Sequence, residues 1–129
     1  MCDRDSLLVE RLEVLLSALE RIPRRFAGIK MADDFLNSDD GLDKLDAICM
    51  ILIATGEAFK QIDKKTSGQL LSRYPQIDWK GIKGIRNVIA HGYFDVDAEQ
   101  VFAVCHTDIP ILIETVRKII DDLNNHTFR

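Results

Sequence analysis

Residues 97–123, DAEQVFAVCHTDIPILIETVRKIIDDL, carry a long regular hydrophobic pattern that decides the fold class. Apolar residues recur every three or four positions, which is the repeat of one face of an α-helix. Asp97 is suited to be the N-cap of this helix, with Gln100 at the capping-box position. Pro110 is expected to bend the helix or to restart it. The apolar stripe consists of Val101, Phe102, Cys105, Ile109, Leu112, Ile113, Val116, Ile120 and Leu123.

The N-terminal part of the chain repeats this helical spacing. Residues 8–22 place leucines and an isoleucine on one face of a helix. Pro23 is expected to end or kink that helix, although Phe26 and Ile29 continue the apolar stripe. The stretch that follows, DDFLNSDDGL at 33–42, is predicted to be a polar connection.

Two further helices are predicted in the middle of the chain. One runs from about Leu42 to Ile62, and Gly56 in its interior indicates close packing by a neighbouring element. A short helix or turn is expected around residues 69–73. The next amphipathic helix is predicted from Asp78 to His91, with Gly92 in the position of a helix C-terminal glycine.

The composition supports a single all-α domain. The chain has 129 residues, of which 47% are hydrophobic and 29% are charged, which is typical of one globular domain. Its 7 glycines and 3 prolines provide little material for a turn-rich β-sandwich or barrel. Four or five helices with short connections therefore predict an up-and-down helical bundle over residues 1–129.

Several functional classes are disfavoured by the sequence. No apolar run approaches the roughly 20 residues that span a bilayer, and the first residues do not resemble a secretory signal, so a cytoplasmic protein is expected. Cys2, Cys49 and Cys105 are odd in number and widely spaced, which fits buried thiols better than a disulfide framework. The histidines lack metal-ligand spacing, and neither a metal nor a cofactor is predicted.

The charge distribution is more informative than the net charge of −4. Basic residues gather in one block from Arg21 to Lys30 and in a second block from Lys60 to Arg86. If these blocks converge in the fold, they create a positive field on an acidic body, with Lys80 and Lys83 as candidate RNA contacts. Solvated helix faces are the simpler explanation of such blocks.

Residues 86–93, RNVIAHGY, are the one segment whose composition suggests chemistry. On a continuous helix Asn87 and His91 share a face, and the long side chain of Arg86 reaches the same side. Guanidinium binds two phosphate oxygens at once, and imidazole can take or give a proton near pH 7. RNA supplies its own nucleophile, the 2′-hydroxyl. The set therefore suits RNA cleavage without a metal, although such spacing also occurs by chance in helical proteins.

The segment RNVIAHGY resembles the Arg-x4-His-x-Tyr signature of HepT-type toxins in the HEPN superfamily of ribonucleases. The similarity extends to Gly56-Glu57-Ala58, to Trp79 before the motif helix, and to Phe94, Val96 and Asp97 after it. Asp108-Ile109-Pro110 also resembles a step found in that family. Thr55 departs from the usual aliphatic residue at its position. The resemblance covers roughly residues 34–115.

The resemblance implies a metal-independent RNA endonuclease that acts as the toxin of a two-component toxin–antitoxin module. Arg86 and His91 would be the catalytic pair, with Asn87 as a supporting polar residue. Tyr93 would accept AMP from a partner nucleotidyltransferase antitoxin, which would block the arginine with bulk and negative charge. The family also implies a homodimer with motifs from two chains lining one cleft. Both tRNA and mRNA fit as substrates.

Two other classes of function stay open. A HEPN-like bundle without catalysis would bind nucleotides or dock a nucleotidyltransferase, and it would not need an imidazole that titrates near neutral pH. A purely structural bundle would use Arg86 in a surface ion pair, His91 as a helix cap, Asn87 as a solvated residue and Tyr93 as a packing residue. Cleavage assays separate these classes from a ribonuclease.

Overall fold

The computed structural model describes residues 3–92 and 94–125, and these form an all-α bundle, as predicted. Within this part of the chain the only extended pairing is an isolated bridge between Ala90 and Val96. The helices are α1 (Asp3–Phe26), α2 (Asp39–Lys65), α3 (Trp79–Lys83), α4 (Ile85–Ile89), α5 (Ala98–Ala103) and α6 (Ile109–Asn124). Two 3-10 turns, η1 (Ala32–Phe35) and η2 (Leu71–Arg73), and a π turn, η3 (Val104–Asp108), complete the elements.

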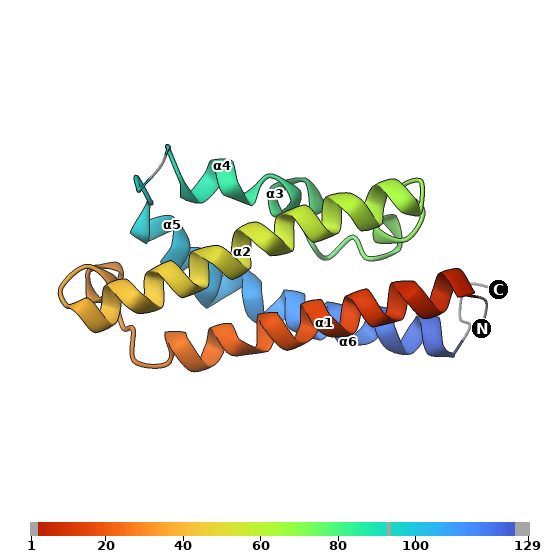
Figure 1. Cartoon of the computed structure of the whole chain (residues 1–129), viewed down its shortest axis with the longest axis horizontal. Helices are drawn as coiled ribbons and strands as arrows, with labels where there is room; N and C mark the ends of the chain where they lie inside the picture. Colours follow the sequence, from red (N-terminus) through yellow and green to blue (C-terminus); the bar gives the residue numbers. More distant parts are fainter. Residues whose placement is uncertain (1–2, 93, 126–129) are drawn as a thin grey trace.

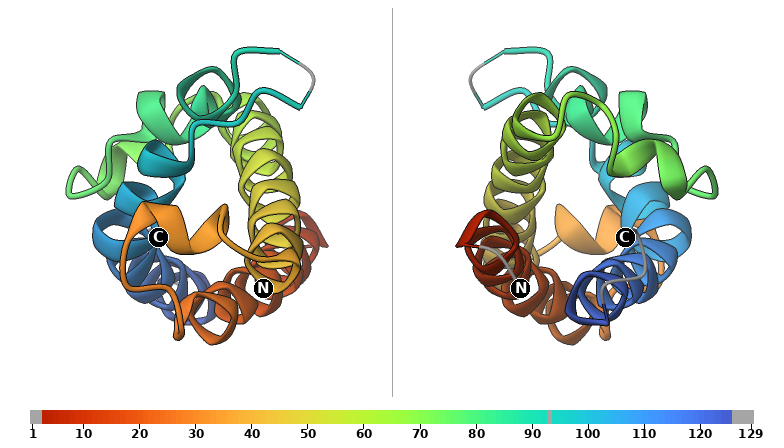
Figure 2. Two further views of the ribbon diagram at one scale, coloured as in Figure 1. Left: turned by 90° about the vertical axis from the view of Figure 1, so that its left-hand side faces the viewer. Right: turned by 90° about the vertical axis from the view of Figure 1, so that its right-hand side faces the viewer.

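The chain runs up and down four times along the long axis of the molecule (Figure 1). Helix α1 is antiparallel to α2, the pair α3–α4 runs back along α2, and α5–α6 returns toward the end where α1 begins. The views along the axis show these four layers surrounding a common core (Figure 2). Fully buried side chains fill it, and the largest include Phe35, Phe59, Leu12, Leu19, Ile48, Leu112 and Ile119.

The first two helices are longer than predicted. Pro23 lies inside α1 and does not end it, because proline has a helical φ and costs a hydrogen bond only one turn before the end at Phe26. Helix α2 begins at Asp39, since the Ser38 hydroxyl caps it by accepting from the Gly41 N–H at 2.9 Å. The predicted polar connection is therefore only partly correct, and it includes the fully buried Phe35.

Gly56 confirms the predicted close approach to α2. A Cβ at this position would lie 2.8 Å from the carbonyl oxygen of Ile82 and 3.1 Å from the Ile85 side chain. The absence of a side chain thus lets the backbone of α3 and the start of α4 pack directly on α2. Trp79 closes the same contact, because its ring centroid is 4.9 Å from that of Phe59. Its indole N–H donates to the Tyr74 carbonyl oxygen at 2.9 Å.

The prediction of one helix from Asp78 to His91 is wrong in two respects. It is divided at Gly84 into α3 and α4, and it ends at Ile89 rather than at His91. Glycine weakens a helix interior, and Ala90 is extended with φ −136° and ψ 138°. Gly92 is consequently not a helix cap but a loop residue with φ +138°.

Helices α5 and α6 form one helical path through the π turn η3, as the stripe at 97–123 predicted. The Asp97 carboxylate caps its start by accepting from the Gln100 N–H at 3.1 Å. Pro110 has no N–H to donate to the carbonyl of His106 four residues earlier. The π turn η3, which is wider than an α-helical turn, ends at Asp108, two residues before Pro110. The proline therefore distorts the helix without ending it. Among the described residues, no helix is long and apolar enough to cross a bilayer.

Candidate active site

Arg86 and Asn87 lie on α4, which is only five residues long and is held by its buried isoleucines. Ile85 and Ile89 are 4% and 0% exposed, so the other face of the helix is left in solvent. Both Arg86 and Asn87 are exposed there. Within the described residues, neither side chain takes part in a hydrogen bond or ion pair that would occupy it. The two polar groups are thus available to a ligand.

His91 lies in a tight reversal beyond the end of α4. Its N–H donates to the Asp95 carbonyl oxygen at 2.8 Å, and the Asp97 N–H donates to the Ile89 carbonyl oxygen at 2.7 Å. These bonds and the Ala90–Val96 bridge fold the loop back on itself. The imidazole is 58% exposed. The loop therefore presents His91 from a fixed backbone position next to α4.

The predicted arrangement of the motif on one helical face is wrong. Asn87 and His91 are four residues apart, but the extended Ala90 interrupts the helix between them. No hydrogen bond or ion pair joins Arg86, Asn87 and His91 within residues 3–92 and 94–125. The structure brings them to neighbouring elements, α4 and its loop, and leaves their side chains independent.

Asp97 is a neighbour of His91 that the motif did not reveal. Its Oδ2 atom lies 3.9 Å from Nε2 of His91, while its Oδ1 atom caps α5. A carboxylate at this distance can help to orient the imidazole ring. The sequence identified Asp97 only as an N-cap, because the pairing with His91 depends on the loop folding back.

Lys80 and Lys83, the predicted RNA contacts, lie together in a groove beside α4. The groove is formed by the C-terminal half of α2, by α3 and by the start of α4, and Asn87 lines it as well. Lys83 is paired with Asp63 of α2, with 2.7 Å between Nζ and Oδ2. Lys80 is exposed. The second basic block therefore converges in part, whereas Arg21 of the first block lines a different groove between α1 and α2.

Tyr93, the predicted AMP acceptor, lies outside the described residues. Its neighbour Phe94 is fully exposed and has φ +66°, a conformation that a bulky residue rarely adopts. The loop thus displays an aromatic side chain, three residues after His91, that neither packing nor backbone preference explains.

The groups with displaced pKa values lie away from the motif. Burial raises the pKa of Cys49 to about 11 and that of Cys105 to about 12. Both thiols are buried, as predicted, and are protonated at neutral pH. Burial and, next, the Asp78 carboxylate raise the pKa of Asp108. Within the described part of the chain, no group of three or more His, Cys, Asp or Glu side chains is arranged to hold a metal ion.

Comparison with known proteins gives this geometry a context. Two proteins of Methanocaldococcus jannaschii, each named as a candidate RNase, are 29% and 35% identical to the chain over 77 residues. Each alignment covers 60% of this chain, and 60% and 63% of the respective relative. A candidate RNase of Caldanaerobacter subterraneus subsp. tengcongensis is 29% identical over 109 residues, or 84% of this chain and 90% of the relative.

The chain spans about three fifths of the length of the two Methanocaldococcus relatives that it matches. No solved structure matches it. The sequence model of the family described as "Ribonuclease HepT-like" matches residues 15–119, which include α2 to α5, the second half of α1 and most of α6. With this match over most of the helical bundle, the chain belongs to the HepT-like ribonuclease family.

Proposed function

We propose that this protein is a metal-independent RNA endonuclease and the toxin of a two-component toxin–antitoxin module. The observation that carries the proposal is the exposure of Arg86, Asn87 and His91 on α4 and its loop, in a chain of the HepT-like ribonuclease family. Imidazole can transfer the protons of phosphodiester cleavage, and guanidinium and amide groups can bind the phosphate oxygens. The substrate is RNA, either tRNA or mRNA.

In the proposed reaction, Arg86 binds the non-bridging oxygens of the scissile phosphate and stabilises the charge that develops on them. A base removes the proton of the 2′-hydroxyl, whose oxygen then forms a bond to phosphorus while the bond to the 5′-oxygen breaks. An acid protonates the departing 5′-oxygen. The products are a 2′,3′-cyclic phosphate and a 5′-hydroxyl end. His91 is the group that transfers protons, and Asn87 supports the phosphate.

A homodimer is part of the proposal, because one motif supplies one imidazole for two proton transfers. A second histidine from the partner copy would fill the second role. The groove between α1 and α2 supports self-association, since Leu7, Val14 and Met50 are 57%, 72% and 74% exposed at its edges. Both acidic and basic side chains, Glu10, Glu13, Arg11 and Arg21, also line this groove.

We further propose that a partner nucleotidyltransferase neutralises the toxin by adding AMP to Tyr93. A nucleotide added to the motif would bring bulk and a negative phosphate that compete with RNA for Arg86. The exposed loop on which Gly92 and Phe94 lie supports access by a second enzyme.

An RNA cleavage assay in excess EDTA tests the proposal. Wild-type protein is expected to give discrete fragments ending in 2′,3′-cyclic phosphate from total cellular RNA, and the His91→Ala variant is expected to give none. Mass spectrometry of Tyr93 is the control, because an adenylylated preparation would be silent. If unmodified wild-type protein leaves RNA intact but binds a nucleotidyltransferase, the non-catalytic binding module replaces the ribonuclease.

A further inference from the structure

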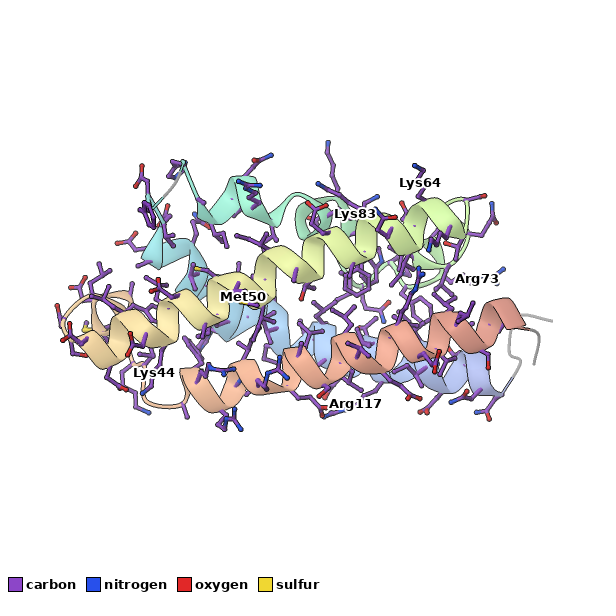
Figure 3. All side chains as sticks on the ribbon, viewed as in Figure 1. Lys44, Met50, Lys64, Arg73, Lys83 and Arg117 are labelled. Carbon is purple, nitrogen blue, oxygen red and sulfur yellow. The ribbon has the colours of Figure 1, made fainter. Side chains whose placement is uncertain are left out.

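The groove beside α4 contains more positive charge than the motif requires. Lys60 and Lys64 reach it from α2, and Lys80 and Lys83 reach it from α3. Figure 3 shows Lys64 and Lys83 on the same side of the molecule, on helices that are distant in sequence. Asp63 is the one acidic residue among the groove residues of the described chain. The groove therefore has a net positive charge on a protein that is acidic overall.

The four lysines differ in whether their ammonium groups form ion pairs. Lys83 and Asp63 form an ion pair at 2.7 Å, and their side chains are only 29% and 26% exposed, so this pair fastens α3 to α2. Lys60 lies 3.2 Å from Glu57 on the surface of α2. Lys64 and Lys80 are exposed, and neither forms an ion pair with another described residue. These two exposed lysines line the groove from different helices, α2 and α3.

The groove reaches one of the candidate catalytic residues. Gly84, the N-cap of α4, and Asn87 of α4 line its end, and Arg86 immediately precedes Asn87 in the sequence. Lys64 belongs to the last turn of α2, so its charge also offsets the negative end of the helix dipole. An RNA strand bound at Asn87 would therefore place its neighbouring phosphates along Lys80 and Lys64. The one carboxylate that lines the groove within the described residues, Asp63, is already paired with Lys83.

We propose that this groove binds the RNA backbone phosphates next to the scissile one, with Lys64 and Lys80 as contact residues and Lys83 as a positioning residue. The proposal rests on the proposed ribonuclease function and specifies where the substrate lies. Lysine contacts phosphates and not base edges, so the groove adds affinity without sequence preference. Binding should then depend on salt, because each contacted phosphate releases counterions.

Affinity for a short single-stranded RNA, measured by fluorescence anisotropy over a range of salt concentrations, tests the groove directly. The background is His91→Ala, which keeps the RNA intact during the measurement. Lys64→Gln with Lys80→Gln is expected to weaken binding about tenfold or more at low salt. Each lost phosphate contact should also reduce the slope of log affinity against log salt by about 0.7.

The matched control is Lys44→Gln with Lys118→Gln, which removes the same charge from α2 and α6 away from the groove. It is expected to leave affinity and slope unchanged. Equal losses in both double variants would overturn the proposal, since they would show an effect of net charge alone. Thermal unfolding of both double variants checks that each is folded, since Lys64, Lys80 and Lys118 are exposed but the Lys44 side chain is only 31% exposed.

Inorganic tripolyphosphate as a second probe distinguishes an RNA track from a pocket for a free nucleotide. If the groove variants lose tripolyphosphate binding but bind RNA normally, the RNA proposal is wrong. The experiments also distinguish a failure of the groove proposal from a failure of the proposed ribonuclease function. Wild-type protein that cleaves RNA, together with groove variants that bind and cleave equally well, would reject the groove alone. Lysine-dependent binding without any cleavage would reject the catalytic assignment alone.

Discussion

The three long helices α1, α2 and α6 differ sharply from the segment between Trp79 and Asp97. The long helices are regular, and apolar residues at helical spacing meet in the core. The second segment consists of two five-residue helices and a loop with an extended Ala90, a positive φ at Gly92 and another at Phe94. The residues proposed for chemistry lie in the irregular segment, and the residues that stabilise the fold lie mainly in the regular one.

This contrast has a physical reason. A side chain in a continuous amphipathic helix either packs in the core or points to solvent on a smooth surface. Breaks in the helix at Gly84 and Ala90 place Asn87 and His91 at different angles on one side of the bundle. The long helices then supply the rigid support that a short, exposed element lacks. The contrast predicts that substitutions in the two regions separate activity from stability.

The largest expected effect is on catalysis. Arg86→Ala and His91→Ala should each lower the rate of RNA cleavage by about two to four orders of magnitude, because each removes a group that acts on the reacting phosphate. Arg86→Lys should also lose most activity, since lysine lacks the two-point geometry. Cleavage rates and urea unfolding are measured together. The control is Arg117→Ala, an exposed arginine that pairs with Glu20 at 2.6 Å. Comparable activity in the variants and the control would contradict the assignment.

A substitution at Phe59 of α2 is expected to affect stability and not the catalytic groups directly. This side chain is fully buried against Trp79, so Phe59→Ala should lower the free energy of unfolding by about 3–5 kcal/mol. Its neighbour Gln61 is exposed, and Gln61→Ala should change stability by less than about 0.5 kcal/mol. Urea denaturation followed by circular dichroism gives both values. A small loss for Phe59→Ala would show that α3 does not depend on this contact.

Asp97 belongs to both regions, because one carboxylate oxygen caps α5 and the other faces His91. Asp97→Asn keeps the cap and removes the charge, whereas Asp97→Ala removes both. The alanine variant should lose about 0.5–2 kcal/mol of stability, and the asparagine variant a few tenths at most. Cleavage should fall several-fold in both. Full activity in Asp97→Asn would show that the carboxylate acts only as a helix cap.

The smallest expected effect concerns Asp108, the last residue of the π turn η3, which shares a cavity lining with Asp78 at the start of α3. The pKa of its carboxyl is raised by burial and by Asp78, so ionisation is less favourable in the folded than in the unfolded state. Its contribution to stability is therefore complete below the unfolded pKa and is lost as the pH rises through the folded pKa. Asp108→Asn should thus be slightly stabilising at neutral pH and lose this advantage near pH 3. Thermal unfolding at both values measures the difference, and a destabilising effect at neutral pH would contradict it.

The sequence predicted the regular helices better than the irregular segment between Trp79 and Asp97. The stripe at 97–123 predicted a single helical path, and it was correct because the spacing of apolar residues expresses the face that a helix buries. Gly56 was predictable for a similar reason, since a glycine inside a helix signals a close neighbour. The helix end at Ile89 was not predictable, because residues 86–91 have ordinary helical composition. The extended Ala90 is favoured by contacts made when the loop folds back. These are the His91–Asp95 and Asp97–Ile89 backbone hydrogen bonds and the Ala90–Val96 bridge.

The sequence by itself determined that this chain is a helical bundle with the motif RNVIAHGY, because periodicity and residue type are local properties. The tertiary structure decided which charged groups meet. Asp63 and Lys83 are 20 residues apart in sequence, and Lys64 and Lys80 face one groove from different helices. Asp97 approaches His91 through a reversal of the backbone. Such pairs depend on how helices pack and where the chain turns, and those are set by the burial of apolar surface over the whole domain and not by the charged residues themselves.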